Sequence, residues 1–377
     1  MKLIHNAILA ILFIIIIFAV FLSNMIKPDR KFSENENRYL STKPKFSFER
    51  LLEGKYSKDI EKYIDDQFIF RENFITAKSN IEQLFPRKDI NGVYLGKDDY
   101  LIEKCLEKDF NYAQLDKNIE LVNSFASTND SLDVSMIIVP TSSLVMNDKL
   151  PDNAPMFNQQ KVFDNLNKRF NSLRYIDVSQ TLIEHNNEYI FYKSDHHWTT
   201  FGAYYAYMAY CKNLGMKHNS YESYNIENVT KSFKGTYYSK VLLDNIYDQI
   251  DIYKTKDQSP YKVYYNNSKT VTDSVFDYDK LEEKDQYQIF FGGNHPELKI
   301  VQEENTAEEK NLLVIKDSYA NSFVPLIMNN YNKVCMIDLR YFNGNLNEYI
   351  KDNNITDVLF LYGIMSFSND NVFNKLI

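Results

Sequence analysis

The sequence predicts an α/β domain built on a doubly wound parallel sheet, with an antiparallel β insertion and an apolar helix at its N-terminus. Short, nearly continuous apolar runs alternate with segments of helical periodicity, the pattern of parallel strands covered on both faces by crossover helices. Between about residues 220 and 305 this rhythm gives way to short β-branched and aromatic stretches separated by polar turns, which indicates inserted hairpins. An apolar run near the N-terminus has the composition of a membrane-spanning helix.

The N-terminal run is apolar from Ala7 to Leu22 and is extended by Met25 and Ile26. That length suffices to cross a bilayer as a helix. Bulky residues stand where a signal peptidase needs small ones, which favours an uncleaved signal-anchor over a cleaved signal peptide. We therefore expect a transmembrane anchor over residues 1–26, an extended tether over 27–55, and an α/β domain over 56–377 that lies outside the cell membrane.

The first half of the domain is predicted from apolar spacing and from helix caps. Steps of three and four predict helices, short apolar runs that end at a proline or a turn predict strands, and Thr199 or Thr200 with Gly215 can cap the helix between them. The expected elements are one or two helices over 56–85 broken near Asp65-Asp66 and ended by Pro86, two short strands over 91–101, a helix over 115–125, a strand over 134–139, a helix over 159–173, a strand over 174–178, and a helix from 199–200 to 215.

The second half is predicted by the same signals. Alternating aromatic and β-branched stretches predict strands at 234–238, 250–253, 261–265 and 288–291, and the glycines and proline of 292–296 predict a closing turn. After residue 309 the α/β pattern returns, with strands at 312–315, 334–337 and 357–362 and helices at 319–331 and 346–351.

Composition excludes some classes of function. The net charge of -8 and the absence of a basic stripe argue against nucleic acid as a partner. The 29 tyrosines and 26 phenylalanines include faces suited to stacking on sugars, although most such residues fill cores. The three cysteines have no CxxC spacing, so they are expected to be buried free thiols rather than metal ligands.

Ser318 occupies the position of a candidate nucleophile. It follows a buried strand and begins a helix, and in an open α/β sheet the binding crevice lies beyond the carboxyl ends of the strands. Backbone N–H groups of the first helical turn would point at the same place, as an oxyanion hole requires. The alternative is that Ser318 only caps its helix.

The run Asp195-His196-His197-Trp198 supplies a candidate base for that serine. A serine hydroxyl needs an imidazole to take its proton and a carboxylate to orient the imidazole. In an extended segment Asp195 and His197 share a side, His196 faces away, and Trp198 walls the site. Two alternatives stay open, a metal site on the adjacent histidines and a purely structural cluster.

These residues carry a resemblance to the DHHW protein family. The ordered set that agrees with it is Ser33-Glu34, Asn37-Arg38, Gly54 with Tyr56, Asp66 with Arg71, Asp195-His196-His197-Trp198, Gly235-Thr236, Gly292-Gly293-Asn294-His295-Pro296, Asp317-Ser318-Tyr319 and Asp338-Leu339-Arg340-Tyr341. The family in turn resembles the SGNH-hydrolase-like alginate O-acetyltransferases AlgJ and AlgX, in which the acid and base precede the serine in a circularly permuted order.

The resemblance implies a catalytic triad of Ser318, His197 and Asp195 and an acyl-serine intermediate. It also implies an oxyanion and substrate region formed by Ser318, Tyr319 and Trp198. Gly293 and Asn294 could supply further donors, or could form a plain tight turn. The Lys-Asp-Ser-Tyr context departs from the Gly-Asp-Ser of ordinary SGNH hydrolases, so their oxyanion hole does not transfer directly.

The expected function is therefore O-acyl transfer or ester hydrolysis on an extracellular polysaccharide or cell-wall glycan, with no metal and no cofactor. A membrane-bound O-acyltransferase is the expected supplier of the acyl group. The alternative is a noncatalytic surface protein that binds glycan or scaffolds an export machine. A separation of more than about 5 Å between the Ser318 hydroxyl and His197 would favour that alternative, because it exceeds the hydrogen-bond reach of unliganded sites.

Overall fold

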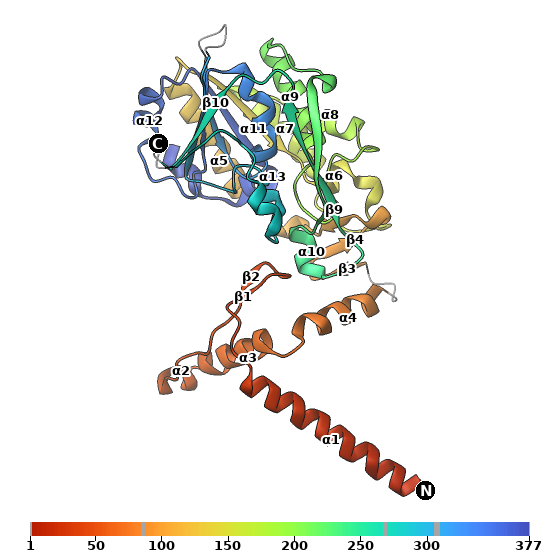
Figure 1. Ribbon diagram of the computed structural model, residues 1–377. Coiled ribbons are helices and arrows are strands. Elements are labelled where there is room, and N and C mark those ends of the chain that lie inside the picture. Colours follow the sequence, from red (N-terminus) through yellow and green to blue (C-terminus); the bar gives the residue numbers. More distant parts are fainter. Residues whose placement is uncertain (1, 84–87, 267–269, 305–309, 377) are drawn as a thin grey trace. The chain divides into compact units, whose positions relative to one another are not determined.

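The computed structural model describes residues 2–83, 88–266, 270–304 and 310–376. The chain forms two compact units (Figure 1). One holds residues 1–87 together with 239–244, and the other holds residues 88–238 and 245–377.

The first unit begins with the apolar helix that the sequence predicts. Its elements are α1 (Lys2–Ile26), β1 (Phe32–Ser33), β2 (Arg38–Tyr39), α2 (Phe48–Leu52), α3 (Lys55–Gln67) and α4 (Arg71–Gln83). Within the described part of the chain, the segment Ile4–Ile26 of α1 is the one helical stretch long and apolar enough to cross a membrane. The break between α3 and α4 lies at residues 68–70 and not near Asp65-Asp66, because Phe68 is extended and Phe70 has a φ of 58°. Pro86 lies outside the described residues.

The short hairpin β1–β2 is tied to α3 and α4 by ion pairs. Arg38 forms a bidentate pair with Asp66, at 2.6 and 3.1 Å, and the backbone N–H of Ser41 donates to the same carboxylate at 2.8 Å. The hydrogen bond from Arg38 is the main reason that the pKa of Asp66 falls to about 2. Glu72 accepts from Ser33 Oγ at 2.8 Å. Residues 30–41 are thereby fixed on the two helices.

The second unit is built on a mixed sheet of eight strands in the described residues. Its order is β11-β10-β12-β14-β13-β15-β6-β7. The strands are β6 (Asp133–Val139), β7 (Arg174–Tyr175), β10 (Tyr261–Tyr265), β11 (Thr270–Thr272), β12 (Glu297–Gln302), β13 (Asn311–Lys316), β14 (Lys333–Ile337) and β15 (Asp357–Gly363). The five strands from β14 to β7 are parallel, as predicted, whereas β10, β11 and β12 are antiparallel.

The predicted insertion is therefore only partly a separate element. Its strands β10–β12 extend the central sheet, because β12 pairs antiparallel with β14. Within the described part of the insertion, β8 (Tyr224–Phe233) and β9 (Asp248–Thr255) are the pair that forms a separate hairpin. The central sheet is thus mixed and mostly parallel, with part of the predicted antiparallel insertion joined to it, and the α/β class is confirmed.

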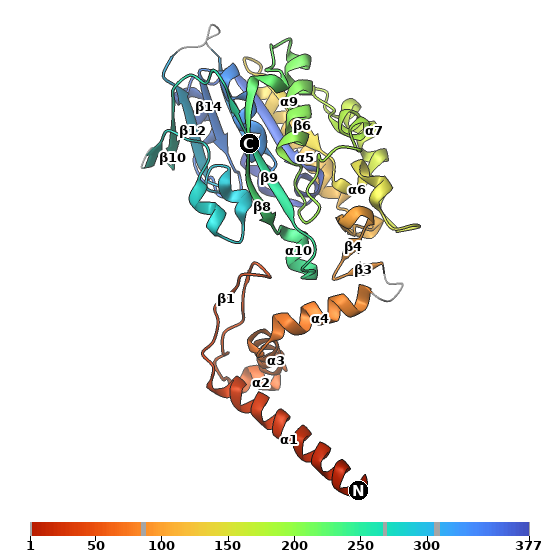
Figure 2. The ribbon, with the colours of Figure 1, turned by 45° about the vertical axis from the view of Figure 1, so that its right-hand side comes forward.

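Helices cover both faces of the sheet (Figure 2). On one face α9 (Thr200–Leu214) and α11 (Ala320–Ile327) bury alternate residues of the parallel strands, together with the β8–β9 hairpin. The opposite face is covered by α5 (Tyr112–Thr128), α7 (Gln159–Arg169), α12 (Leu346–Asp352) and α13 (Ile364–Asn369). The remaining elements are β3 (Asp89–Ile90), β4 (Val93–Leu95), β5 (Leu101–Glu103), α6 (Ser142–Val145), α8 (Ser179–Glu184) and α10 (Thr236–Val241).

Local signals in the sequence succeed at α9 and fail in the insertion. Thr199 caps α9 by accepting from Gly202 N at 3.2 Å, and Gly215 ends it with a φ of 66°. The predicted strand at 234–238 instead runs into helix α10, and the predicted strand at 288–291 is a 3-10 turn over Gln286–Ile289. Tyr and Phe favour strands only where a neighbouring strand pairs with them, and at these two places the described chain offers no more than an isolated bridge between Phe290 and Phe276.

Candidate active site

The carboxyl ends of β6, β13, β14 and β15 meet at one edge of the sheet, and Ser318 lies there between β13 and α11. Asp317 fixes the turn that presents it, since its carboxylate accepts from Tyr319 N at 3.0 Å and from Gly363 N at 2.9 Å. Burial raises the pKa of Asp317, and these two hydrogen bonds oppose that shift. The serine turn is thus fastened to the end of the neighbouring strand β15.

The Asp195–Trp198 motif forms a tight loop and not the extended segment expected from the sequence. A bridge between Phe191 and Trp198 closes the loop, and Tyr192 N donates to His197 O at 3.2 Å. The loop turns the side chain of Asp195 toward the residues that follow it, so that its Oδ1 accepts from the backbone N–H of His197 at 3.0 Å. The turn, rather than a two-residue strand repeat, brings the acid to the imidazole.

Asp195, His197 and Ser318 form a continuous hydrogen-bonded series. His197 Nδ1 lies 2.6 Å from Asp195 Oδ1, and His197 Nε2 lies 2.7 Å from Ser318 Oγ. The second distance is well within the limit of about 5 Å set above. Asp195 accepts only when Nδ1 carries the proton, which leaves the Nε2 lone pair facing the serine hydroxyl.

The carboxylate of Asp195 is buried and surrounded by donors. Burial opposes its ionisation, but attraction to His196 and His197 and the hydrogen bonds from His197 and Thr236 hold its pKa well below the ordinary value. Thr236 N donates to Asp195 Oδ2 at 2.7 Å. Gly235 packs so closely that an added Cβ would lie 2.2 Å from Asp195 Cβ. Gly235 and Thr236 therefore fix the position of the Asp195 side chain, Gly235 by close contact and Thr236 by a hydrogen bond.

Asp248 on β9 anchors the residues just before Asp195, and no sequence signal singles it out. The residue is 3% exposed, and its carboxylate accepts four hydrogen bonds. The donors are Tyr189 OH at 2.5 Å, Lys193 N at 2.7 Å, Ser194 N at 2.7 Å and Ser194 Oγ at 2.5 Å. Ser194 Oγ in turn accepts from Gly235 N at 3.0 Å, so one buried carboxylate links the β8–β9 hairpin to the loops around Asp195.

Two tyrosines enclose the imidazole. Tyr287 stacks on His197 with ring centroids 4.0 Å apart and planes 12° from parallel, and its hydroxyl donates to Ser318 O at 3.2 Å. Tyr319 meets the edge of the same ring at 5.1 Å, and its hydroxyl donates to His196 O at 2.5 Å. The sequence predicts a role for Tyr319 but none for Tyr287, which lies directly before the segment 288–291 that the sequence predicts to be a strand.

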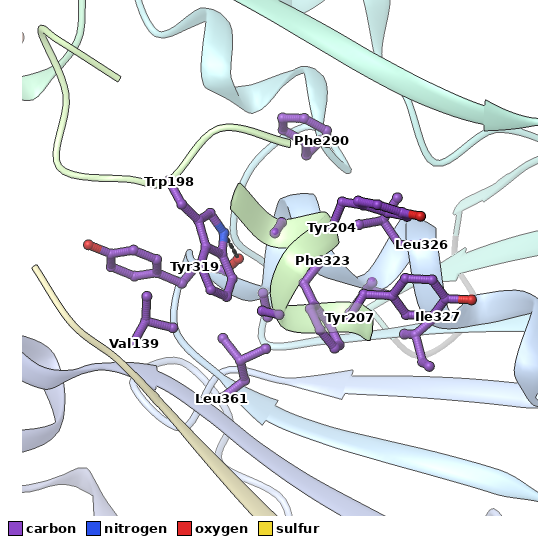
Figure 3. Packing of buried hydrophobic residues seen from close by; sticks show 14 of the residues in the cluster. Val139, Trp198, Tyr204, Tyr207, Phe290, Tyr319, Phe323, Leu326, Ile327 and Leu361 are labelled. Atoms are coloured by element: carbon purple, nitrogen blue, oxygen red, sulfur yellow. Dashed lines mark hydrogen bonds between the residues drawn. The ribbon is translucent and has the colours of Figure 1, made fainter. Parts of the chain in front are cut away.

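Trp198 lies in the core below the serine turn rather than along an open crevice. Its side chain is fully buried, and its indole N–H donates to Tyr319 O at 3.1 Å and to Ser322 Oγ at 3.0 Å. Figure 3 shows the indole between the motif loop and the ring of Tyr319, with the first of these hydrogen bonds drawn. Trp198 therefore connects the Asp195–Trp198 loop to the turn that carries Ser318.

Gly293 and Asn294 form part of a turn next to a buried lysine. Gly293 N donates to Phe290 O at 3.2 Å, so this N–H is used within the turn. Asn294 Oδ1 accepts from Lys316 Nζ at 2.6 Å, and Lys316 Nζ also donates to Asn321 Oδ1 at 2.8 Å. Burial lowers the pKa of Lys316 to about 8.

His196 does not face away from the acid, contrary to expectation. Its ring lies 3.8 Å from that of His197 between centroids, and its Nδ1 is 3.5 Å from Asp195 Oδ1. The three side chains offer ligand atoms within 4.8 Å of one another, as a metal site would. Both ring nitrogens of His197 are already hydrogen-bonded, so a metal ion on them would have to break the contact with Asp195 or Ser318.

Comparison with solved structures identifies two proteins with the same fold and one with weaker similarity. A DHHW family protein from Eubacterium siraeum matches with a TM-score of 0.66 and 24% identity over 76% of this chain and 95% of that chain. PatB1 from Bacillus cereus, solved with a sulfonyl adduct, matches at 0.62 and 20% identity over 74% and 98%. The O-acetyltransferase domain of Pseudomonas putida AlgJ matches at 0.48 and 14% identity over 74% and 93%.

Comparison of sequences gives the family. No curated protein matches the sequence. The sequence model of the DHHW protein family matches residues 108–337, a segment that runs from before the first parallel strand to the end of β14 and contains both motifs of the site. The chain belongs to the DHHW protein family.

Proposed function

We propose that this chain is a membrane-anchored serine O-acyltransferase or esterase that acts on a cell-surface glycan, with Ser318, His197 and Asp195 as its catalytic triad. The single observation that carries the proposal is the 2.7 Å contact between Ser318 Oγ and His197 Nε2, with Asp195 on the other ring nitrogen at 2.6 Å. Capping of a helix by Ser318 would not require an imidazole at this place.

In the first half of the reaction Ser318 becomes acylated. Its Oγ attacks the carbonyl carbon of the acyl donor while its proton passes to His197 Nε2. Asp195 stabilises the imidazolium without taking its proton. When the tetrahedral intermediate collapses, the donor's leaving oxygen takes the proton from Nε2, and the acyl group stays on Ser318 as an ester.

In the second half an acceptor hydroxyl takes the acyl group. It gives its proton to His197 Nε2 and attacks the acyl-serine, and the serine oxygen recovers a proton from the imidazolium. Water in place of the sugar hydroxyl gives hydrolysis. Which one reacts depends on how far the bound acceptor excludes water.

The backbone N–H of Ser318 is the proposed first oxyanion donor. Among the described residues it has no hydrogen-bond acceptor, whereas the N–H of Tyr319 donates to Asp317. A free N–H at the start of a helix is the group that stabilises developing negative charge. We assign no such role to Gly293 N, because Phe290 O already accepts from it.

A cavity of about 440 Å³ near the end of β14 is the proposed acceptor region. It is lined in part by Tyr341, Asn343, Asn345 and Glu348. Residues 341–345 of the lining follow β14, and β14 neighbours β13 with Ile337 opposite Ile315, so part of the lining comes from the same edge of the sheet as Ser318. An exposed aromatic ring beside amides and carboxylates is a combination suited to sugar rings and their hydroxyl groups.

The proposed location follows from α1. A helix of this length and composition suits a retained signal-anchor that keeps the second unit outside the cell. Glycan modification there needs an acyl donor from across the membrane. A membrane-bound O-acyltransferase is therefore the proposed partner that delivers it.

The test uses the full chain in detergent, with an aryl acetate and with a sulfonyl fluoride. Sulfonyl reagents trap activated hydroxyls, and PatB1, which shares this fold, was solved with a sulfonyl adduct. Mass spectrometry should find an acetyl or sulfonyl group on Ser318. Ser318→Ala should lower aryl acetate turnover at least about 1,000-fold.

Ser143→Ala is the matched control, because Ser143 lies shortly after β6 and its hydroxyl pairs with Thr141 instead of an imidazole. It should behave as the parent chain does. Equal turnover by Ser318→Ala and the parent chain, with no adduct on Ser318, would refute the triad and favour a noncatalytic glycan-binding protein.

A further inference from the structure

Outside α1, the first unit exposes large apolar side chains at a much higher density along the chain than the second does. Outside α1, nine of them lie between residues 39 and 81, whereas the described part of the second unit exposes seven over residues 112–341. The nine are Tyr39, Phe46, Phe48, Leu51, Leu52, Ile64, Phe70, Phe74 and Ile81. Soluble surfaces rarely concentrate apolar groups in this way, and such concentrations mark interaction sites.

Hydrogen bonds fix this surface to the end of α1. Asn24, near the end of the helix, accepts from Ile69 N at 2.7 Å. Gln67 exchanges two hydrogen bonds with the backbone of Arg30, at 3.0 and 2.8 Å, and Tyr63 OH donates to Asp29 at 2.8 Å. The junction between α3 and α4 therefore lies at the same level as the end of the apolar helix.

The length of α1 then sets the depth of that junction. The apolar segment Ile4–Ile26 has 23 residues. At 1.5 Å per residue it is about 34 Å long, slightly more than the roughly 30 Å hydrocarbon core of a bilayer. If α1 spans the membrane, Asn24 lies near the boundary between hydrocarbon and headgroups, and so does Ile69, which donates to it.

Apolar side chains around this junction point away from the unit. Phe70 and Phe74 are 64% and 61% exposed, and Ile81 continues the same face of α4 two turns later. Phe70 holds a φ of 58°, a conformation that costs a bulky residue about 1–2 kcal/mol, although most of its side chain is exposed. Beside them, Phe68 and Phe74 line a groove of about 500 Å³.

We propose that α2, α3 and α4 form a membrane-seating collar, residues 46–81, that rests on the lipid bilayer and inserts Phe70, Phe74 and Ile81 into its interface. Aromatic rings favour that level of the bilayer. Lys43 and Lys45 precede the exposed Phe46 and Phe48, as expected of a segment that meets lipid headgroups. The inference rests on the part of the proposed function that keeps α1 as an anchor, and it is independent of the triad.

The collar can be tested with site-specific probes on the full chain. The three native cysteines are buried, so a cysteine introduced at the surface can be labelled selectively. Phe70→Cys, Phe74→Cys and Ile81→Cys would each carry an environment-sensitive fluorophore in nanodiscs of phosphatidylcholine and phosphatidylglycerol. The matched control is Asn80→Cys, an exposed polar position on another face of α4.

At the three collar positions we expect blue-shifted emission. A spin label in the lipid should quench the fluorescence there several-fold more strongly than a spin label in water. At Asn80 the aqueous spin label should quench more strongly than the lipid one. Stronger quenching from water at all four positions would overturn the collar. Protection of the collar positions only in native membranes, and not in lipid nanodiscs, would also overturn it and indicate a protein partner.

The intact mass of the purified chain reports separately on the anchor. Retention of residues 1–26 is the expected result. A mature chain without them would overturn both the anchor and the collar, because nothing would then hold residues 68–70 at the bilayer surface. Aryl acetate turnover and the Ser318 adduct, measured on the same sample, would still decide the triad.

Discussion

The close packing of Gly235 against Asp195 gives a sharp test of how the acid is positioned. In Gly235→Ala the new methyl group would lie 2.2 Å from Asp195 Cβ and 2.5 Å from Oδ2. Carbon atoms in contact are about 3.5 to 4 Å apart, so the acid must move by more than about 1 Å. The carboxylate then leaves its 2.6 Å contact with His197 Nδ1. A misplacement of this size costs about 100-fold in rate, or about 2.7 kcal/mol.

The assay is aryl acetate turnover by the full chain, with thermal unfolding measured in parallel. Gly215→Ala is the matched control, since Gly215 has a φ of 66° and open space around it. It should lose about 1 to 2 kcal/mol of stability from backbone strain and keep its kcat/KM. If Gly235→Ala retained kcat/KM within threefold of the parent chain, or lost no more than Gly215→Ala, the argument that Gly235 positions Asp195 would be wrong.

Three further predictions concern groups near the site. Asp248→Asn places an amide NH2 against the backbone N–H of either Lys193 or Ser194, whichever way the amide is turned. The free energy of unfolding, measured by urea titration, should therefore fall by about 2 to 4 kcal/mol, and kcat should fall with it. If Asp248→Asn lowered neither the free energy of unfolding nor kcat, the role given to Asp248 would be refuted. Burial lowers the pKa of Lys316 from 10.5 to about 8. Between pH 8 and 10.5 the unfolded chain therefore keeps a proton on Lys316 that the folded chain has released. Because of this difference, the free energy of unfolding should rise by about 3 kcal/mol from pH 8 to 10.5. Urea titrations across that range should show this rise missing in Lys316→Met, and an identical rise in both chains would contradict it. Tyr287→Leu removes the ring stacked on His197 and should lower kcat more than Tyr287→Phe does, and equal rates in the two would argue against a stacking role.

Much of the scaffold could be predicted because its signals are local. The five parallel strands can be recognised as short apolar runs. The two residues that cap α9, Thr199 and Gly215, can also be recognised in the sequence. The proximity of His197 to Ser318 followed from the rule that crevices form at the carboxyl ends of strands, together with the family resemblance.

What could not be predicted depends on partners far apart in the chain. Asp248 lies 54 residues beyond Ser194, and nothing in its neighbourhood distinguishes a buried acceptor of four hydrogen bonds from one more acid in a β-rich segment. The tight loop of the motif is closed by a bridge to Phe191 and by Tyr319, and a four-residue pattern does not encode either contact. Pairing of β12 with β14 is likewise decided by tertiary contacts and not by the strand sequences themselves.

The distance in sequence between the proposed base and the proposed nucleophile has a consequence for when the proposed chemistry can begin. His197 and Ser318 are 121 residues apart, on loops that meet only when the sheet has assembled around β13. If the proposed triad is catalytic, a chain that has not yet folded carries a serine that is no more reactive than any other. The proposed reactivity is then acquired late in folding, and unfolded chains should leave esters around them intact.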